Sequence, residues 1–217
     1  MQVILFDVDG VLIDGYHYRP EYRKCWHKNL KEDFGIDPEY FSNTFFHDPY
    51  STKVLMGKMD LREALKEWLP SAGYFGDVNK FIKYWLENDS ALNMRLIEKI
   101  KYLKKSNTVR LFIATNQEKN RVDYLMNTLG LSAFFDDIFY SAKLQAMKPS
   151  KEYFDYISDY LNLSDYNKPI IFDDTPKVIE YANLIGWHGY EFIDADSVKK
   201  SPFVNKILQH EKVIYDV

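Results

Sequence analysis

The sequence predicts an α/β fold, a parallel sheet with helices on both faces, interrupted by a mostly helical insert. Three observations support this prediction. Short apolar runs end at polar turns, stretches with helical periodicity lie between them, and a long segment near the amino terminus is helical in character without a convincing strand. Strands that alternate with helices favour a parallel sheet, because each crossover helix then covers one of its faces.

The strands are predicted from runs that are apolar at successive positions, as is typical of strands buried on both faces. Three runs are strong: Val3–Asp7, Leu111–Ala114 (followed by Thr115-Asn116) and Ile170–Phe172 (followed by Asp173-Asp174). Two weaker candidates are Asp137–Tyr140 and Tyr190–Ile193. Helical periodicity predicts the core helices Asn93–Lys105, Lys119–Leu129, Lys151–Leu161, Pro176–Ile185 and a final one at Val198–Gln209.

The segment from about Tyr16 to Asp89 interrupts this alternation and is too long for a plain loop between strands. It holds four stretches with helical periodicity, Glu21–Phe34, Glu39–Phe46, Leu61–Leu69 and Val78–Leu86. We therefore expect one domain made of residues 1–15 and 90–217, and a helical insert made of residues 16–89.

Composition limits the class of protein. The chain has 217 residues, 46% of them hydrophobic and 28% charged, which is typical of a globular protein. A net charge of −4 with dispersed lysines gives no support for nucleic-acid binding. Apolar runs stay well below the roughly 20 residues of a membrane span, so no membrane association is expected. Cys25 is the only cysteine, which favours a reducing compartment, and we expect a cytoplasmic protein.

Acidic side chains follow two of the strong strands. Asp7 and Asp9 close the first, and because side chains two apart on an extended segment point the same way, both can face one point. Asp173-Asp174 follow a second strand, and ligands of open α/β sheets bind beyond the carboxyl ends of the strands. Taken alone, Asp7 and Asp9 also fit an Asp-rich turn. A calcium-binding loop does not fit. If Asp7 is its first position, the sixth is Leu12, where such loops need Gly.

Clustered carboxylates repel one another and a phosphate, and a bound divalent cation removes both problems. Hard oxygen ligands favour Mg²⁺. Lys148, before Pro149, supplies a positive charge that can contact both a phosphoryl group and an aspartate. Thr115 offers a hydroxyl and Asn116 a backbone N–H and an amide; both residues equally fit simple capping of the helix that starts at Lys119.

Together these elements resemble the haloacid dehalogenase-like superfamily, specifically its aspartate-nucleophile phosphatases. The four motifs that carry the resemblance are Asp7-Val8-Asp9-Gly10-Val11-Leu12, Thr115 after Leu111–Ala114, Lys148-Pro149, and Asp173-Asp174 after Ile170–Phe172. Their order and spacing agree over nearly the whole chain. The resemblance implies a Rossmann-like core and identifies the helical insert as similar to the cap of that family. Met56-Gly57-Lys58-Met59-Asp60 and Ala114-Thr115-Asn116-Gln117 look like the branch of sugar-phosphate phosphatases and epoxide hydrolase phosphatase-like domains.

The resemblance also implies a role for each residue. Asp7 attacks phosphorus and becomes an aspartyl-phosphate. Asp9 protonates the leaving oxygen and then accepts a proton from water, which works best if its pKa lies above that of Asp7. Thr115 and the Asn116 backbone hold the phosphoryl oxygens, and Lys148 neutralises their charge.

The implied Mg²⁺ ligands are an Asp7 oxygen, the main-chain carbonyl of Asp9, and Asp174. Asp173 would support Asp174 without binding the metal itself, or these two roles would be reversed. The implied reaction is hydrolysis of a small phosphorylated metabolite. Two alternatives stay open: a phosphomutase of the same superfamily, and a non-catalytic binding domain that keeps the fold. An acid at Asp9 favours phosphoryl chemistry over carbon–halogen cleavage, which needs no protonated leaving group.

Overall fold

A five-stranded parallel sheet forms the centre of the protein in this computed structural model, which describes residues 1–164 and 167–215. The strand order is β3-β2-β1-β4-β5, and every neighbouring pair is parallel. The strands are β1 (Gln2–Phe6), β2 (Val109–Thr115), β3 (Asp137–Tyr140), β4 (Ile170–Asp173) and β5 (His188–Glu191). The α/β prediction is confirmed. Because β2 lies on one side of β1 and β4 on the other, the chain switches direction across the sheet at the carboxyl end of β1.

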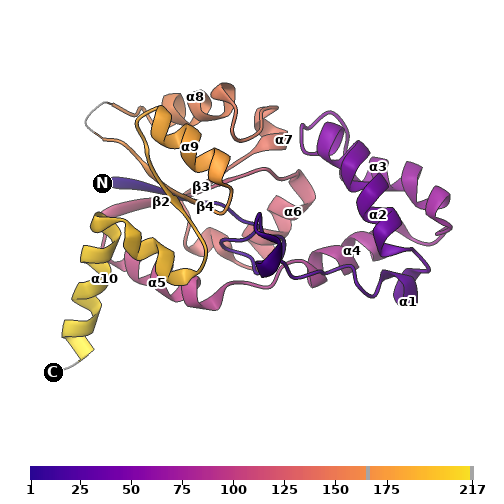
Figure 1. Ribbon diagram of the computed structural model, residues 1–217, viewed down its shortest axis with the longest axis horizontal. Coiled ribbons are helices and arrows are strands. Elements are labelled where there is room, and N and C mark those ends of the chain that lie inside the picture. The colour runs from indigo at the N-terminus through magenta and orange to yellow at the C-terminus, as the bar shows by residue number, and fades with distance from the viewer. Residues whose placement is uncertain (165–166, 216–217) are drawn as a thin grey trace.

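Helices cover both faces of the sheet, as the burial of β1 on both of its faces requires. Ile4 and Phe6 pack with α5 (Met94–Lys105), α6 (Lys119–Asp123) and α10 (Pro202–Tyr215) on one face. Val3 and Leu5 pack with α8 (Lys151–Tyr160) and α9 (Pro176–Leu184) on the other. Figure 1 shows these two layers above and below the strands. Shorter helical elements complete the core region: η4 (Tyr124–Thr128), η5 (Leu131–Ala133), α7 (Ser141–Leu144) and η6 (Ala195–Lys200).

Residues 16–89, called the cap segment here, lie beyond the carboxyl ends of the strands and are helical (Figure 1). The elements are η1 (Pro20–Tyr22), α1 (Leu30–Phe34), α2 (Pro38–Thr44), η2 (Phe46–Val54), α3 (Leu61–Trp68), η3 (Leu69–Ala72) and α4 (Val78–Asn88). Their buried side chains, from Leu30 to Leu86, form a hydrophobic cluster separate from the two clusters that flank the sheet. Aromatic rings dominate it; Trp26 and Trp85, for example, stack with their centroids 5.1 Å apart.

The two connections between the cap segment and the sheet lie side by side. Ile13 and Leu92 form an antiparallel bridge. The Asp14 amide donates to the carbonyl of Ala91 at 2.7 Å, and the Asn93 amide donates to that of Leu12 at 2.9 Å. The chain therefore leaves the core and returns to it at one place.

Three predicted elements need correction. The helix predicted at Glu21–Phe34 is only η1 and α1, because residues 23–29 form no helix. The predicted strand Tyr190–Ile193 begins two residues earlier, as β5. The predicted helix Val198–Gln209 is split at Ser201, and α10 begins at Pro202, whose fixed φ suits a first helical position. None of the helices described combines the length and the apolar composition that crossing a lipid bilayer requires.

Candidate active site

Three carboxylates gather at the carboxyl ends of β1 and β4. Asp7 directly follows β1, and Asp173 and Asp174 end and follow β4, which pairs with β1 in register. Asp7, Asp173 and Asp174 are all buried, and each offers a ligand oxygen within 4.8 Å of the others. The adjacent parallel strands bring these distant segments together, and each strand end delivers its acidic side chain to the same edge of the sheet.

Lys148 lies among these carboxylates. Its Nζ is 2.9 Å from Asp7 Oδ1 and 2.6 Å from Asp173 Oδ2, and it also donates to the carbonyl of Ala114 at 2.6 Å. Burial by itself would lower the pKa of Lys148, but the charges of Asp173 and Asp7 raise it, so the ammonium group stays charged. One buried cation thus compensates part of the negative charge at the site.

The pKa values of Asp173 and Asp174 are both raised. Burial is the main cause of the rise of the Asp174 pKa to about 7, and the charge of Asp7 is the next. Burial likewise raises the pKa of Asp173 to about 6, against the lowering effect of Lys148. Buried carboxylates that repel one another are stabilised by a hard cation, and three oxygen donors at this separation fit one. The donor set therefore meets the requirement of a divalent metal site.

Asp173 and Asp174 have different partners. Asp173 accepts from Lys148 and from the Thr175 amide at 2.9 Å, and is fully buried. Asp174 accepts from the Tyr18 amide at 2.5 Å and from the Thr175 hydroxyl at 3.2 Å. Thr175 precedes α9, and its hydroxyl contacts this acid instead of capping the helix.

Thr115 ends β2 and Asn116 follows it, and β2 pairs with β1, the strand that precedes Asp7. Thr115 is buried, and it directly follows Ala114, whose carbonyl Lys148 contacts. The side chain of Asn116 donates to the Lys148 carbonyl at 3.0 Å and accepts from the Lys148 amide at 2.8 Å, so it fixes the position of Lys148. Neither residue caps the following helix. Glu118 does so, accepting from the amides of Asn120 and Arg121, and the capping alternative for Thr115 and Asn116 is wrong.

Asp9 does not share the ligand cluster through its side chain. Its Oδ1 accepts from Arg121 Nη2 at 2.8 Å, and its Oδ2 accepts from the Gln117 side-chain amide. Burial raises the pKa of Asp9 to about 6; Arg121 opposes the shift, while Asp89 and then Asp7 add to it. Burial is thus the largest cause of the raised pKa of Asp9, and the neighbouring carboxylates add to it.

Sequence reasoning missed Gln117 and Arg121, buried polar residues that donate to Asp9, and the buried Glu118, which caps α6. A signal for Arg121 exists. It lies four residues before Leu125 on the predicted helix, and therefore on the buried face with that leucine. A charged residue at such a position needs a buried partner of opposite charge.

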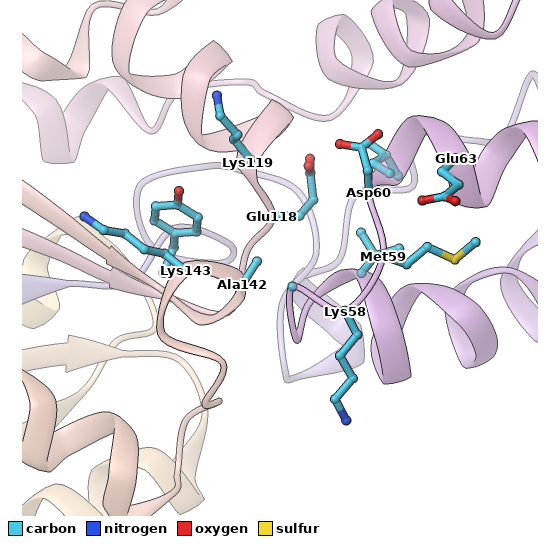
Figure 2. Close-up of a pocket in the computed structure, with 12 residues that line it drawn as sticks. Lys58, Met59, Asp60, Glu63, Glu118, Lys119, Ala142 and Lys143 are labelled. Atoms are coloured by element: carbon cyan, nitrogen blue, oxygen red, sulfur yellow. The ribbon is translucent and has the colours of Figure 1, made fainter.

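A separate cavity of about 350 Å³ opens between the cap segment and the core (Figure 2). Glu118, Lys119, Ala142 and Lys143 face it from the core, and the stretch from Lys58 to Glu63 faces it from the cap segment. Its lining includes none of the predicted site residues. The three carboxylates and Lys148 lie outside this cavity, at the carboxyl ends of β1 and β4.

Comparison with known proteins identifies the family. Residues 1–186 match the family model for haloacid dehalogenase-like hydrolases. The protein belongs to this family. As a haloacid dehalogenase-like hydrolase the chain is an enzyme, and the resemblance predicted from the four motifs is confirmed. The comparison with curated proteins found no similar sequence.

Solved structures share the fold of this hydrolase. One, described as a predicted HAD-like family hydrolase from Porphyromonas gingivalis, is 20% identical with a TM-score of 0.73 and covers 96% of this chain and 98% of its own. A HAD family enzyme of Bacteroides thetaiotaomicron, in complex with magnesium and inorganic phosphate, is 16% identical with a TM-score of 0.70, covering 88% and 93%. A putative β-phosphoglucomutase from Thermotoga maritima is 21% identical with a TM-score of 0.55, covering 88% and 85%.

Proposed function

We propose that this hydrolase is a Mg²⁺-dependent phosphatase that cleaves a small phosphate monoester, such as a sugar phosphate, with Asp7 as the nucleophile. One observation carries the proposal. Asp7, at the end of the central strand, has the Lys148 ammonium 2.9 Å away on one oxygen and two further buried carboxylates within ligand distance. This arrangement suits an attack on a phosphoryl group whose own charge must be neutralised.

The proposed reaction has two steps, both on this chain's own residues. In the first, a carboxylate oxygen of Asp7 forms a bond to phosphorus while the ester P–O bond breaks, and Asp9 gives its proton to the leaving oxygen. In the second, water attacks the aspartyl-phosphate and passes a proton to Asp9. The bond between phosphorus and Asp7 breaks, which regenerates the carboxylate and releases inorganic phosphate.

The proposed metal ligands are an Asp7 oxygen, the main-chain carbonyl of Asp9, and Asp174, with Asp173 behind them. Asp173 is fully buried and accepts from the Lys148 ammonium at 2.6 Å, which supports this order because Lys148 already balances its charge. The metal would supply positive charge beside the phosphoryl oxygens. The choice of Mg²⁺ rests on the oxygen donors and on the magnesium and phosphate complex of the similar Bacteroides enzyme.

The proposed substrate contacts are the Thr115 hydroxyl, the Asn116 backbone N–H and the Lys148 ammonium. Since the Asn116 side chain is engaged with the Lys148 backbone, only the main chain of Asn116 is assigned to the phosphoryl group.

We further propose that residues 16–89 form a cap domain on a core domain of residues 1–15 and 90–217. The separate hydrophobic cluster of the cap segment and its position over the strand ends support this division (Figure 1). Such a cap excludes water and selects the substrate. With a single exposed cysteine and a phosphorylated metabolite as substrate, the proposed compartment is the cytoplasm.

The test is Mg²⁺-dependent release of phosphate from aryl phosphates, then from a panel of sugar phosphates, nucleotides and phosphoglycolate. We expect the wild-type protein to be active and Asp7→Asn to be inactive. Asp155→Asn is the matched control, because Asp155 is an exposed carboxylate paired with Lys151 on α8. Retained turnover in Asp7→Asn would refute the nucleophile assignment.

The second candidate is phosphomutase activity, which the similarity to the putative β-phosphoglucomutase of Thermotoga maritima favours. There the phosphoryl group on Asp7 would pass to a sugar hydroxyl instead of water. Incubation with a sugar 1-phosphate separates the two candidates, since a phosphatase yields free phosphate and a mutase yields the isomeric sugar phosphate.

A further inference from the structure

Arg121 joins the proposed general acid to the end of the cap segment. Its guanidinium side chain is 3% exposed. Nη2 donates to Asp9 Oδ1 at 2.8 Å and to the Asp89 carbonyl at 2.6 Å, and Nη1 donates to Asp89 Oδ2 at 2.8 Å. One buried fork of donors thus joins Asp9, which precedes the inserted segment, to Asp89, its last residue.

Asp89 is the anchor of this arrangement. It follows α4 directly, at the point where the cap segment returns to the core. Its Oδ2 also accepts from the indole nitrogen of Trp85 at 3.1 Å, and the Trp85 ring packs in the aromatic cluster of the cap segment. Three contacts, two from Arg121 and one from Trp85, therefore fix the position of the Asp89 carboxylate and main chain.

Both oxygens of Asp9 are held from the same side of the site. Arg121 binds Oδ1 and Gln117 binds Oδ2, and both donors come from the segment that begins α6. A carboxyl group has about four lone-pair positions, so two remain for the proton that it must carry. The orientation of the carboxyl plane is set by these two contacts, and proton transfer depends on that orientation.

A buried ion pair by itself is weak evidence for a contribution to stability, because desolvation offsets much of the attraction. The forked geometry is more informative. A lysine would satisfy the charge balance with one point contact, whereas Arg121 contacts two separate carboxylates and one carbonyl through two nitrogens. These contacts fix the positions of Asp9 and Asp89 relative to each other, in addition to balancing their charge.

We infer that Arg121 is a positioning residue for proton transfer by Asp9, and that Asp89 holds Arg121 in place for that role. This inference rests on the proposed phosphatase function and adds two residues to it. Arg121 touches neither the nucleophile nor the carboxylate cluster in any contact described, so its effect is confined to the two proton transfers of Asp9, to the leaving oxygen and from the attacking water.

The experiment compares two substrates that differ in their need for an acid. The p-nitrophenolate ion leaves without a proton, whereas the alkoxide of an alkyl phosphate needs one. We expect Arg121→Met to lower kcat/KM for the alkyl phosphate by about 100-fold or more, the usual contribution of general acid catalysis. This parameter reports formation of the aspartyl-phosphate, the step in which the two substrates differ. For p-nitrophenyl phosphate the loss should stay below about tenfold. Arg121→Lys should restore part of the activity on the alkyl phosphate. Asp89→Asn should lower the ratio of alkyl phosphate to p-nitrophenyl phosphate activity, as Arg121→Met does.

Arg95→Met is the matched control, because Arg95 is an exposed arginine that also pairs with a carboxylate, Asp196. It should leave both rates unchanged. Equal losses on the two substrates in the Arg121 and Asp89 variants would overturn the inference, since a folding or binding defect affects both. If Arg121→Met does not fold, the ratio in Arg121→Lys and Asp89→Asn decides. A wild-type protein without Mg²⁺-dependent turnover of either ester would instead refute the phosphatase proposal itself.

Discussion

The Lys148 ammonium nitrogen lies 2.9 Å from Asp7 Oδ1, and the same nitrogen is 2.6 Å from Asp173 Oδ2. A single buried cation therefore holds two acids that come from different strands. Because Lys148 is itself fixed through Asn116, the end of β2 also takes part in this arrangement. The site is a property of three strand ends together.

Replacing Lys148 by Met should destabilise the protein and abolish most activity. Two buried carboxylates would lose their cation, which for a broken buried pair costs about 3–5 kcal/mol. Loss of the charge beside the phosphoryl group should lower kcat by about 100-fold or more. Urea unfolding and phosphate release measure the two effects. Lys151→Met, at an exposed lysine paired with Asp155, is the control and should change neither; near-native stability of Lys148→Met would contradict the buried pairing.

Asp174→Asn should remove the stabilisation by Mg²⁺. A ligand that binds only the folded state stabilises it by about 2.7 kcal/mol at 100 times its Kd, so the wild-type Tm should rise on adding the metal. The variant should show no such rise, whereas Asp155→Asn should behave as the wild type. Thermal unfolding with Mg²⁺ and with a chelator measures this. A Tm rise that survives in Asp174→Asn but disappears in Asp173→Asn would reverse the order of the two acids.

Gly57→Ala should weaken the contact between the cap segment and the core. Gly57 has a φ of +65°, and a Cβ there would overlap the backbone carbonyl of Ala142. Gly35 is a matched control, with a φ of +71° and open space around it. Both substitutions place Ala in the left-handed region, which costs about 1–2 kcal/mol.

Only Gly57→Ala adds the overlap, so its loss of stability should exceed that of Gly35→Ala by about 1–3 kcal/mol. Chemical denaturation measures the difference. Equal losses would show that the Gly57 loop moves away from Ala142 without cost.

The His27 ring should make the protein less stable in mild acid. Burial lowers the pKa of His27 below its usual 6.5, and Asp89 offsets only part of that shift. The unfolded chain then binds the proton more readily than the folded chain. The contribution of His27 to stability is therefore complete above about pH 6.5 and declines as the pH falls through and below that value.

His27→Gln removes this titration, and its amide can still bond to Ser42, which contacts His27 Nε2 at 3.0 Å. The unfolding free energy of the wild type minus that of His27→Gln should become smaller as the pH falls from 8 to 5.5. Taking the difference cancels the carboxylates common to both proteins. A pH-independent difference would contradict the lowered pKa.

Much of the fold could be predicted because its strands are buried on both faces. Such strands give continuous apolar runs, as at β1, β2 and β4. β5 was misplaced by two residues because it is a half-exposed edge strand, His188–Glu191, without that run. Residues 23–29 have helical spacing but form no helix, since packing of Trp26 on Trp85 determines their path instead.

The acidic site residues could be predicted for a related reason. Each follows a recognisable strand, so the topology of the sheet brings them to one edge. Arg121 and Asp89 could not be predicted together, because their partnership depends on how the end of the insert meets α6. No periodicity in the sequence predicts a contact between two residues that lie 32 positions apart.

The bridge between Ile13 and Leu92 has a consequence for how this architecture can change. Since departure and return occur at neighbouring positions, a short turn from Asp14 to Ala91 could close the core with its strand order intact. Inserts of other lengths and shapes could be grafted at the same point. The sheet and the proposed cap can therefore diversify independently, apart from contacts such as those of Tyr18, Gly57 and Asp89.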